Sequence, residues 1–519
     1  MLQPWHPRKN HMEIIEAIKD EDVEMALLKE IPISFAKNNL IMPLRREGCS
    51  ILAAVAAESG VLALRELALG CGLLPKPLKA ARDVIVDAVN RFYGQLGSAA
   101  DIMDEIAGED LSLVATEFER PRDILGLIED APIIRLLNAL LQQAVKEKAS
   151  DIHIEPYEKE LEVRMRTDGI LRKVLSPPKI IQEALVSRIK IMASLDIAEK
   201  RLPQDGRIRL IVGGRDIDIR VSIVPTTFGE RAVLRLLDRS HGVIGLNVLG
   251  LSPEDAGRFE GLLSRTTGIL LVTGPTGSGK TTTLYAALNR LHTGEKNIIT
   301  IEDPVEYQLK GVGQIHVNPK IGLTFAMGLR SILRQDPDVI MVGEIRDFET
   351  AETAIQASLT GHLVFSTLHT NDAPTALTRL IDMGIEPFLI ASSLVAVLAQ
   401  RLVRNICLDC KEGYAPAEEA AYFSGPSNEG VPAVLYRGRG CAKCNSSGYL
   451  GRTGIFEMLY IDNEIRQMIT AKKDAQAIRD YAVSNGMRTL YMDGLNKVML
   501  GITTLEEVLR VTQKDYAGI

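Results

Sequence analysis

Residues 268–282 have the sequence GILLVTGPTGSGKTT, and this stretch decides the fold around it. An apolar run comes first, followed by a glycine-rich loop that matches the pattern G-x-x-x-x-G-K-[ST] in full. The next residues, TTTLYAALNRL, are compatible with a helix. Glycines let backbone N–H groups converge on phosphate oxygens, and a helix N-terminus adds positive charge there. The order of strand, loop and helix therefore predicts a nucleotide-binding P-loop rather than a chance glycine-rich turn.

The loop also predicts which groups hold ATP and its magnesium ion. Lys280 is placed to reach the β- and γ-phosphates, and the hydroxyl of Thr281 is placed to ligate Mg²⁺. The predicted ATP-binding residues are Gly274, Pro275, Thr276, Gly277, Ser278, Gly279, Lys280, Thr281 and Thr282.

Short apolar runs recur on the C-terminal side of the loop, separated by stretches compatible with helices. With the run before the loop they are GILLV, NIITI, DVIMV and LVFST. This alternation predicts a parallel sheet with helices on both faces. Ligands of such sheets bind at the carboxyl ends of the strands, so the residues that follow each run are candidates for catalysis.

Two carboxylates and a histidine follow these runs. Glu302 lies in TIEDPVEY, and Glu344 lies in DVIMVGEIRD. Gly343 occupies the place where many P-loop enzymes have a magnesium-associated aspartate, which leaves Glu344 as the candidate that holds Mg²⁺ through water. Glu302 is then the candidate that polarises the attacking water, although the opposite assignment stays open. His369 is a candidate for sensing or bonding the γ-phosphate. The alternative for the two acids is that they cap helices or lie solvated at strand ends. The alternative for the histidine is a structural role.

The pattern changes upstream of the loop. Ile217, Ile219 and Val221 alternate with polar residues, and a period of two predicts strands with one buried face. Similar alternation around residues 152–165 extends this pattern. Residues 131–241 therefore read as a small α+β domain with an antiparallel sheet.

Four cysteines form two matched pairs near the C-terminus. Cys407-x₂-Cys410 and Cys441-x₂-Cys444 are separated by thirty residues. Two such knuckles supply four thiolates, the usual ligands of a tetrahedral structural Zn²⁺ site, although this spacer is longer than in common zinc ribbons. The prediction is a structural zinc site, with unrelated free cysteines as the alternative.

Length and composition exclude several classes of protein. The chain of 519 residues is long enough for three or four domains, and six cysteines are too few for a disulfide scaffold. A net charge of −7 and 5% aromatic residues disfavour nucleic acid as the main partner. The most continuous apolar stretch, FLIASSLVAVLA (residues 388–399), is too short to span a membrane and is expected to be a buried helix. No signal peptide is evident at the N-terminus, so we expect a cytoplasmic protein.

Together these segments resemble the secretion ATPase superfamily, which powers type II secretion, type IV pilus assembly and type IV secretion. The P-loop, TIEDPVEY, DVIMVGEIRD and LTGHLVFSTLHTND correspond in order to its Walker A loop, aspartate box, atypical Walker B motif and histidine box. The resemblance covers roughly residues 131–519. It implies a homohexamer bound peripherally at the cytoplasmic face of the inner membrane, in which a RecA-like ATPase domain follows a PAS-like domain.

The resemblance also implies roles for upstream residues. Arg207 in RLPQDGR and Arg220 in IRVS look like the family segments whose arginines reach the triphosphate. A planar guanidinium stays charged and bonds phosphate in a bidentate manner. The alternative is that both arginines are ordinary surface residues of strands. The stretches LKEIPISFA and LIMPL resemble the N-terminal module with which secretion and pilus-extension members dock an inner-membrane platform.

The expected fold is therefore multidomain α/β with a tetracysteine insert. We expect a helical N-terminal docking domain (1–95), a linker (96–130), the PAS-like domain (131–241) and the RecA-like domain (242–519), including a zinc-binding insert (405–452) and C-terminal helices (453–519). The predicted function is an ATPase motor for type II pseudopilus assembly and protein export. Type IV pilus extension is the main alternative, and a DNA-translocating ring is less favoured.

Overall fold

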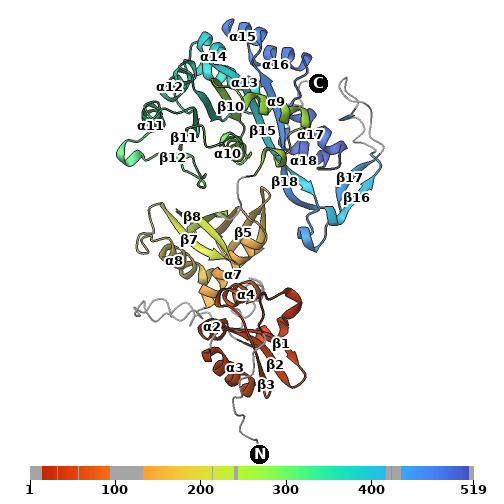
Figure 1. The fold of residues 1–519 in the computed structure, drawn as a ribbon. Coiled ribbons are helices and arrows are strands. Elements are labelled where there is room, and N and C mark those ends of the chain that lie inside the picture. The colour runs from red at the N-terminus through yellow and green to blue at the C-terminus, as the bar shows by residue number, and fades with distance from the viewer. Residues whose placement is uncertain are drawn as a thin grey trace, which may run out of the picture. The chain divides into compact units, whose positions relative to one another are not determined.

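Figure 1 shows a computed structural model of the chain. It describes residues 14–93, 132–238, 244–416, 422–423 and 434–512, apart from residues 32, 57 and 213. The chain divides into two compact units, Met1–Ser240 and His241–Ile519. Within the described residues, no helix is both long and apolar enough to cross a membrane. The linker expected at 96–130 lies outside these residues.

The N-terminal region is a small α/β domain, so the prediction of a helical domain was wrong. Its three-stranded sheet has the order β1-β2-β3, with β1 and β2 antiparallel and β2 and β3 parallel. The strands are β1 (Ile41–Glu47), β2 (Ser50–Val55) and β3 (Leu74–Lys79). The helices are α1 (Met25–Glu30), α2 (Ile33–Asn38), α3 (Glu58–Gly70) and α4 (Arg82–Tyr93).

Burial explains the wrong prediction for this domain. The β2 residues SILAAV include two alanines, which favour helices by intrinsic propensity, but five of the six residues are buried in the sheet. A fully buried strand has no alternating pattern and cannot be told from a buried helix by periodicity. Strand β3 contains Pro75 and Pro77, which suit its place at the edge of the sheet because an edge strand tolerates a missing N–H donor.

The second region of the first unit is an antiparallel sheet, as the alternating pattern predicts. The six strands have the order β6-β5-β4-β9-β8-β7. They are β4 (Asp151–Pro156), β5 (Leu161–Thr167), β6 (Ile170–Leu175), β7 (Gln204–Val212), β8 (Arg215–Thr226) and β9 (Gly229–Asp238). Alternate residues form an apolar core with the helices α7 (Pro132–Lys146) and α8 (Gln182–Met192).

The second unit is built on a seven-stranded sheet with the order β12-β11-β13-β14-β10-β15-β18. Its pairs are parallel except for β15 and β18, which run antiparallel. The strands are β10 (Gly268–Thr273), β11 (Ile298–Glu302), β12 (Gly313–His316), β13 (Val339–Val342), β14 (Leu363–Leu368), β15 (Leu394–Ile406) and β18 (Tyr449–Tyr460). The four apolar runs therefore form β10, β11, β13 and β14.

Helices cover both faces of this sheet. Ile269 and Leu271 of β10 belong to one buried cluster, whereas Leu270 and Val272 belong to another. A strand buried on both faces reads as a continuous apolar run, which is why GILLV was recognisable in the sequence. The helices are α9 (Pro253–Leu263), α10 (Lys280–Leu291), α11 (Phe325–Ile332), α12 (Phe348–Leu359), α13 (Ala373–Asp382) and α14 (Pro387–Ser393).

Two expectations for the C-terminal half need correction. The stretch FLIASSLVAVLA does not form one helix, because α14 ends at Ser393 and β15 begins at Leu394. The C-terminal helices expected at 453–519 begin only after β18, so residues 453–460 belong to that strand. Four helices follow that strand: α15 (Asn463–Thr470), α16 (Ala475–Ser484), α17 (Leu490–Met499) and α18 (Leu505–Thr512).

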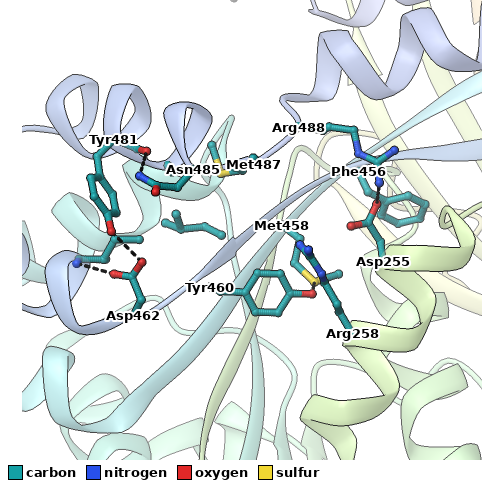
Figure 2. A pocket seen from close by; sticks show the side chains of 14 residues that line it. Asp255, Arg258, Phe456, Met458, Tyr460, Asp462, Tyr481, Asn485, Met487 and Arg488 are labelled. Carbon is teal, nitrogen blue, oxygen red and sulfur yellow. Dashed lines mark hydrogen bonds and ion pairs between the residues drawn. The ribbon is translucent and has the colours of Figure 1, made fainter. Parts of the chain in front are cut away.

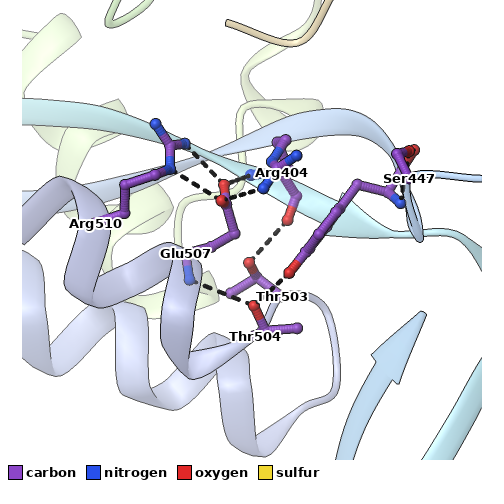
Figure 3. Close-up of polar contacts among 7 residues, drawn as sticks. Arg404, Ser447, Thr503, Thr504, Glu507 and Arg510 are labelled. Carbon is purple, nitrogen blue, oxygen red and sulfur yellow. Dashed lines mark hydrogen bonds and ion pairs between the residues drawn. The ribbon is translucent and has the colours of Figure 1, made fainter. Parts of the chain in front are cut away.

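Helix α18 is anchored to β15 by a buried carboxylate, which Figure 3 shows. The Nη2 group of Arg404 donates to Oε1 of Glu507 at 2.6 Å, and Nε of Arg510 donates to the same oxygen at 2.9 Å. The guanidinium of Arg404 also lies 4.0 Å from the centre of the Tyr449 ring. The ion pairs therefore hold the last described helix against the strand that leads to the cysteines.

A small pocket lies between α9, β18 and α16, and Figure 2 shows its lining. Tyr460 pairs with Ala396 near the beginning of β15, whereas Ala399, further along, pairs with Thr273 before the P-loop. The Tyr460 end of the pocket therefore lies toward the amino ends of the parallel strands.

Candidate functional site

The glycine-rich loop joins β10 to α10 and contains glycines that other residues cannot replace without strain. The φ angles of Gly274, Gly277 and Gly279 are +146°, +79° and +89°. A Cβ atom on Gly274 would lie 2.4 Å from the carbonyl oxygen of Gln400, and one on Gly279 would lie 2.8 Å from its Nε2. Strand β15 therefore forms a close wall behind the loop.

Lys280 is the first residue of α10 and folds back over the loop. Its Nζ donates to the carbonyl oxygens of Gly274 at 2.8 Å and Pro275 at 3.1 Å. Burial lowers the pKa of Lys280, while the charge of Glu344 acts in the opposite direction. An ammonium group in these surroundings has few water ligands to lose, so phosphate oxygens are suitable partners.

The rest of the loop is partly open. Pro275, Thr276, Gly277 and Thr281 are exposed. The hydroxyl of Ser278 is buried and has no hydrogen-bond partner among the described residues. An orphaned hydroxyl beside converging glycines fits a loop that completes its hydrogen bonds with a phosphate.

Glu344 and His369 come together after β13 and β14. The Nε2 atom of His369 lies 3.0 Å from Oε2 of Glu344, and Arg346 forms an ion pair with Oε1 of the same carboxylate. His369 remains about half exposed, whereas the side chain of Glu344 is 13% exposed. Thr370, the next residue, donates from its backbone N–H to the hydroxyl of Thr273 at 2.9 Å, which ties this corner to the strand before the P-loop.

Glu302 is the last residue of β11 and is buried. Its Oε1 atom accepts from the hydroxyl of Thr300 at 2.5 Å and from Nε2 of Gln314 at 3.1 Å. Its Oε2 atom accepts from the hydroxyl of Tyr285. Because β13 and β14 separate β11 from β10, Glu302 lies further along the strand order from the P-loop strand than Glu344.

The candidate arginines belong to the first unit, where they form a row across three strands. Arg207 of β7 is paired in register with Arg220 of β8, which is paired with Arg235 of β9. Arg207 forms a two-pronged ion pair with Asp218, a fully buried carboxylate, and Nε of Arg235 donates to Asp151 at 3.0 Å. The row lies on the face of the sheet opposite the apolar core.

The four predicted zinc ligands converge. Their sulfur atoms all lie within 4.8 Å of one another. The separations are 3.8 Å for Cys407 and Cys441, 3.9 Å for Cys410 and Cys444, and 3.7 Å for Cys441 and Cys444. Four thiolates around zinc at a Zn–S distance of about 2.3 Å have sulfurs about 3.8 Å apart, so this group fits a tetrahedral zinc ion.

Backbone N–H groups favour the thiolate form of one of these cysteines, Cys444, whereas burial raises the pKa of Cys407 and Cys410. Cys441 and Gly448 donate to the sulfur of Cys444 at 3.2 and 3.3 Å. Burial acts to raise the pKa of Cys444, but these hydrogen bonds outweigh it and bring the pKa down to about 6. The thiolate is the form that binds zinc. Cys49 and Cys71 lack partners at metal spacing, which predicts small buried residues. The structure shows both as free and exposed instead.

Sequence reasoning missed several residues that shape the site. Tyr285 reaches Glu302 from α10, and Gln400 accepts from the hydroxyl of Thr283 at 2.6 Å behind the loop. Thr300 lies two positions before Glu302 on one strand, so a period of two already places both on one face. Tyr285 and Gln400 come from separate elements, and no local pattern relates them to the loop.

The sheet carries a P-loop that follows β10 and leads into α10, with Glu344 near Lys280. These features define the class of P-loop ATPases. Residues 127–510 match the family described as type II/IV secretion system protein, and residues 14–99 match the MshEN domain. The chain belongs to the type II/IV secretion system protein family. The predicted secretion ATPase is thereby confirmed, and the N-terminal α/β domain is its MshEN domain.

Curated relatives cover most of the chain. The type II secretion system ATPase E of Vibrio cholerae is 54% identical over 422 residues, which are 80% of this chain and 83% of that protein. The type II secretion system protein E of Dickeya dadantii is 49% identical over 96% of this chain and its own full length. The type IV pilus assembly ATPase PilB of Myxococcus xanthus is 44% identical over 96% of this chain and 88% of that protein.

Solved structures share the fold. The X-ray structure of the Legionella pneumophila ATPase DotB matches with a TM-score of 0.54 at 21% identity, over 73% of this chain and 96% of that chain. The DotB structure from Yersinia pseudotuberculosis matches with a TM-score of 0.55 at 22% identity, over 73% of this chain and 93% of that chain. At these identities the similarity concerns the fold.

Proposed function

We propose that this chain is the subunit of a homohexameric motor that hydrolyses ATP to power pseudopilus assembly and protein export by a type II secretion system. The observation that carries the proposal is the P-loop itself, over which Lys280 folds back. Glu344 lies near enough for its charge to act on the pKa of this lysine. The relatives named as type II secretion proteins support this branch of the family.

The acids have separate roles in this proposal. Thr281 and Glu344 would hold Mg²⁺, which neutralises charge on the phosphates when it is bound. Glu302 polarises the attacking water and accepts its proton as the bond between the γ-phosphorus and the bridging oxygen breaks. His369, which shares a hydrogen bond with Glu344, reports the state of the γ-phosphate. Lys280 and the loop N–H groups stabilise the negative charge that develops on the phosphate oxygens.

The first unit supplies positive charge in this proposal. Arg207 and Arg220 lie opposite each other on neighbouring strands, on the same face of the sheet. In this proposal both guanidinium groups contact the triphosphate. Arginines that contact a transferring phosphoryl group are worth about 10³ to 10⁵ in rate. We further propose that the parts correspond to a PAS-like domain and a RecA-like domain, and that Cys407, Cys410, Cys441 and Cys444 hold a structural zinc ion.

We propose a cytoplasmic protein that associates peripherally with the inner membrane. Its MshEN domain would bind platform proteins of the secretion system, which supply the membrane anchor. Nucleic acid is not an expected partner, because the chain carries a net charge of −7. Extension of a type IV pilus is the second candidate function, favoured by the 44% identity to PilB.

The test of ATP hydrolysis compares two lysines. Lys280→Ala should lower the steady-state hydrolysis rate of the purified full-length chain by at least about 100-fold, because the main cation at the phosphates is lost. Lys473→Ala, which removes an exposed lysine after α15, is the matched control and should keep the original rate. Hydrolysis at the original rate in Lys280→Ala would contradict the proposal.

A further inference from the structure

The carboxylate of Glu302 is held by three donors that do not share its two oxygens equally. Oε1 accepts two hydrogen bonds, from Thr300 at 2.5 Å and from Gln314 at 3.1 Å. Oε2 accepts one, from the hydroxyl of Tyr285. An ionised carboxylate has about four acceptor positions, two on each oxygen. Oε2 therefore keeps room for one more donor, whereas Oε1 is filled.

Tyr285 is suited to hold this carboxylate in one orientation. Its side chain is completely buried, and its ring meets that of Tyr307 edge-on with centroids 4.6 Å apart. Its hydroxyl also lies 3.4 Å from the backbone nitrogen of Glu306 and 3.4 Å from Nε2 of Gln314. Burial raises the pKa of Tyr285 strongly, and the negative charge of Glu302 adds to that effect. The phenol therefore stays a hydrogen-bond donor throughout the physiological pH range.

Tyr285 also links this carboxylate to the P-loop. It belongs to α10, the helix whose first residue is Lys280. Tyr285 lies five positions after Lys280 along the helix, a rise of about 7.5 Å. A rigid helix that carries both groups keeps the phosphate-binding lysine and the hydroxyl on Glu302 at a fixed spacing along its axis. The arrangement joins the place where phosphate is bound to the place where water is polarised.

From this geometry we infer that Tyr285 is a positioning residue for hydrolysis: its hydroxyl fixes Glu302 so that Oε2 presents its remaining lone pair to the attacking water. The inference rests on the proposed role of Glu302. Tyr285 does not touch the reacting atoms and acts through the carboxylate. Its loss should slow the chemical step and leave nucleotide binding intact.

The test measures single-turnover hydrolysis and nucleotide affinity separately, using the full-length oligomer with Mg²⁺ and a fluorescent ATP analogue for binding. Tyr285→Phe removes one oxygen atom and should slow single-turnover hydrolysis about tenfold, as expected when a hydrogen bond to a charged group is lost. The dissociation constant for the nucleotide should stay within about twofold, because the P-loop is unchanged. Tyr460→Phe, which removes a hydroxyl in the pocket of Figure 2, is the matched control and should keep the original rate.

A double-mutant cycle with Glu302→Gln tests whether the tyrosine acts through the carboxylate. Combined with Glu302→Gln, Tyr285→Phe should cause no further loss, because the group it positions is already disabled. A single-turnover rate in Tyr285→Phe equal to the original, with Glu302→Gln strongly slowed but still measurable, would overturn this inference alone. An additional tenfold loss in the double variant would also overturn it. Full activity in Glu302→Gln would instead contradict the proposed role of Glu302 itself.

A second variant keeps the test decisive if Tyr285→Phe does not fold. Thr300→Val removes a donor to Oε1 and leaves Gln314 on that oxygen. Because the water is assigned to Oε2 and Gln314 still donates to Oε1, Thr300→Val should slow hydrolysis by less than about threefold, even though its bond is also made to the carboxylate. A tenfold or greater loss in Thr300→Val with unchanged nucleotide affinity would contradict the assignment of the water to Oε2.

Discussion

Arg207 and Asp218 form an ion pair in which one partner is exposed and the other is fully buried. The side chain of Arg207 is 44% exposed, whereas that of Asp218 has no exposure. Such a pair orients the guanidinium on the sheet surface, because the buried carboxylate cannot turn toward solvent. At the scale of single residues, this ion pair connects the stability of the first unit with the proposed binding of the triphosphate.

Arg207→Ala should therefore have two effects. Hydrolysis by the purified full-length chain should fall by about 10³-fold or more, the range expected for an arginine on a transferring phosphoryl group. The melting temperature should also fall, because Asp218 is left buried without its partner. Arg207→Lys is the informative comparison, because it keeps a positive charge near Asp218 but lacks the planar guanidinium. The melting temperature should largely recover in this variant, and the hydrolysis rate should stay low. Unchanged hydrolysis in Arg207→Ala would remove the arginine from the mechanism.

Single residues differ in how far the sequence reveals them. The P-loop residues and the four cysteines could be predicted because their spacing alone defines the chemistry. Tyr285 and Gln400 were missed because hydrogen bonds between distant elements bring them to Glu302 and to the loop. The positions of Glu302 and Glu344 at strand ends were predictable, while the burial of Glu302 depends on three-dimensional neighbours.

Secondary-structure elements also differ in how well the sequence predicts them. The strands β10, β11, β13 and β14 were recognisable because helices separate them in a regular order. The strand β2 and the first half of β15 were expected to be helical. Apart from Ser50, SILAAV and LVAVLA are apolar throughout and have no period. Pairing with neighbouring strands decides whether such a segment forms a strand or a helix. Thr273 of β10, for example, pairs with Ala399 of β15.

The zinc knuckles can be tested as an element. Elemental analysis of carefully purified protein should find about one zinc ion per chain, and Cys444→Ser should lose it. Bound zinc would stabilise the insert by about 10 kcal/mol, so loss of the metal should also lower the unfolding temperature. Cys71→Ser, which changes an exposed cysteine elsewhere in the chain, should retain the metal. Less than about half a zinc ion per chain in the unaltered protein would count against the site.

The anchor of α18 predicts a pH dependence. Burial acts to raise the pKa of Glu507, but hydrogen bonds from Arg404 and Arg510 outweigh it and lower the pKa from 4.5 to about 2. A carboxyl whose pKa is lower in the folded state stabilises the fold above pH 4.5, and this contribution is lost as the pH falls from about 4.5 to about 2. The anchor should therefore be complete at neutral pH.

Glu507→Gln should accordingly lower the melting temperature at pH 7, and its difference from the original protein should shrink as the pH approaches 2. Thermal unfolding followed across this pH range measures the effect. Glu506→Gln changes the exposed neighbouring residue and is the matched control. A difference between Glu507→Gln and the original protein that stays constant from pH 7 to pH 2 would contradict the assignment of the shift to these ion pairs.

At the scale of the whole molecule, three regions divide the proposed work. The MshEN domain would bind the platform, the row of arginines on the six-stranded sheet would meet the triphosphate, and the seven-stranded sheet presents the P-loop at its carboxyl edge. Contacts made to the γ-phosphate are lost when it leaves, so hydrolysis would drive movement of the groups that bind it. The account therefore predicts that export depends on hydrolysis as well as on the presence of the protein.

Export by the native host is the measurement that tests this claim most directly. The Lys280→Ala chain should be made at normal levels while the secreted proteins of the type II system disappear from the medium and pilus assembly continues. Replacement with the Lys473→Ala chain should restore export in the same strain. Normal export with Lys280→Ala, or loss of pili with export intact, would contradict the account.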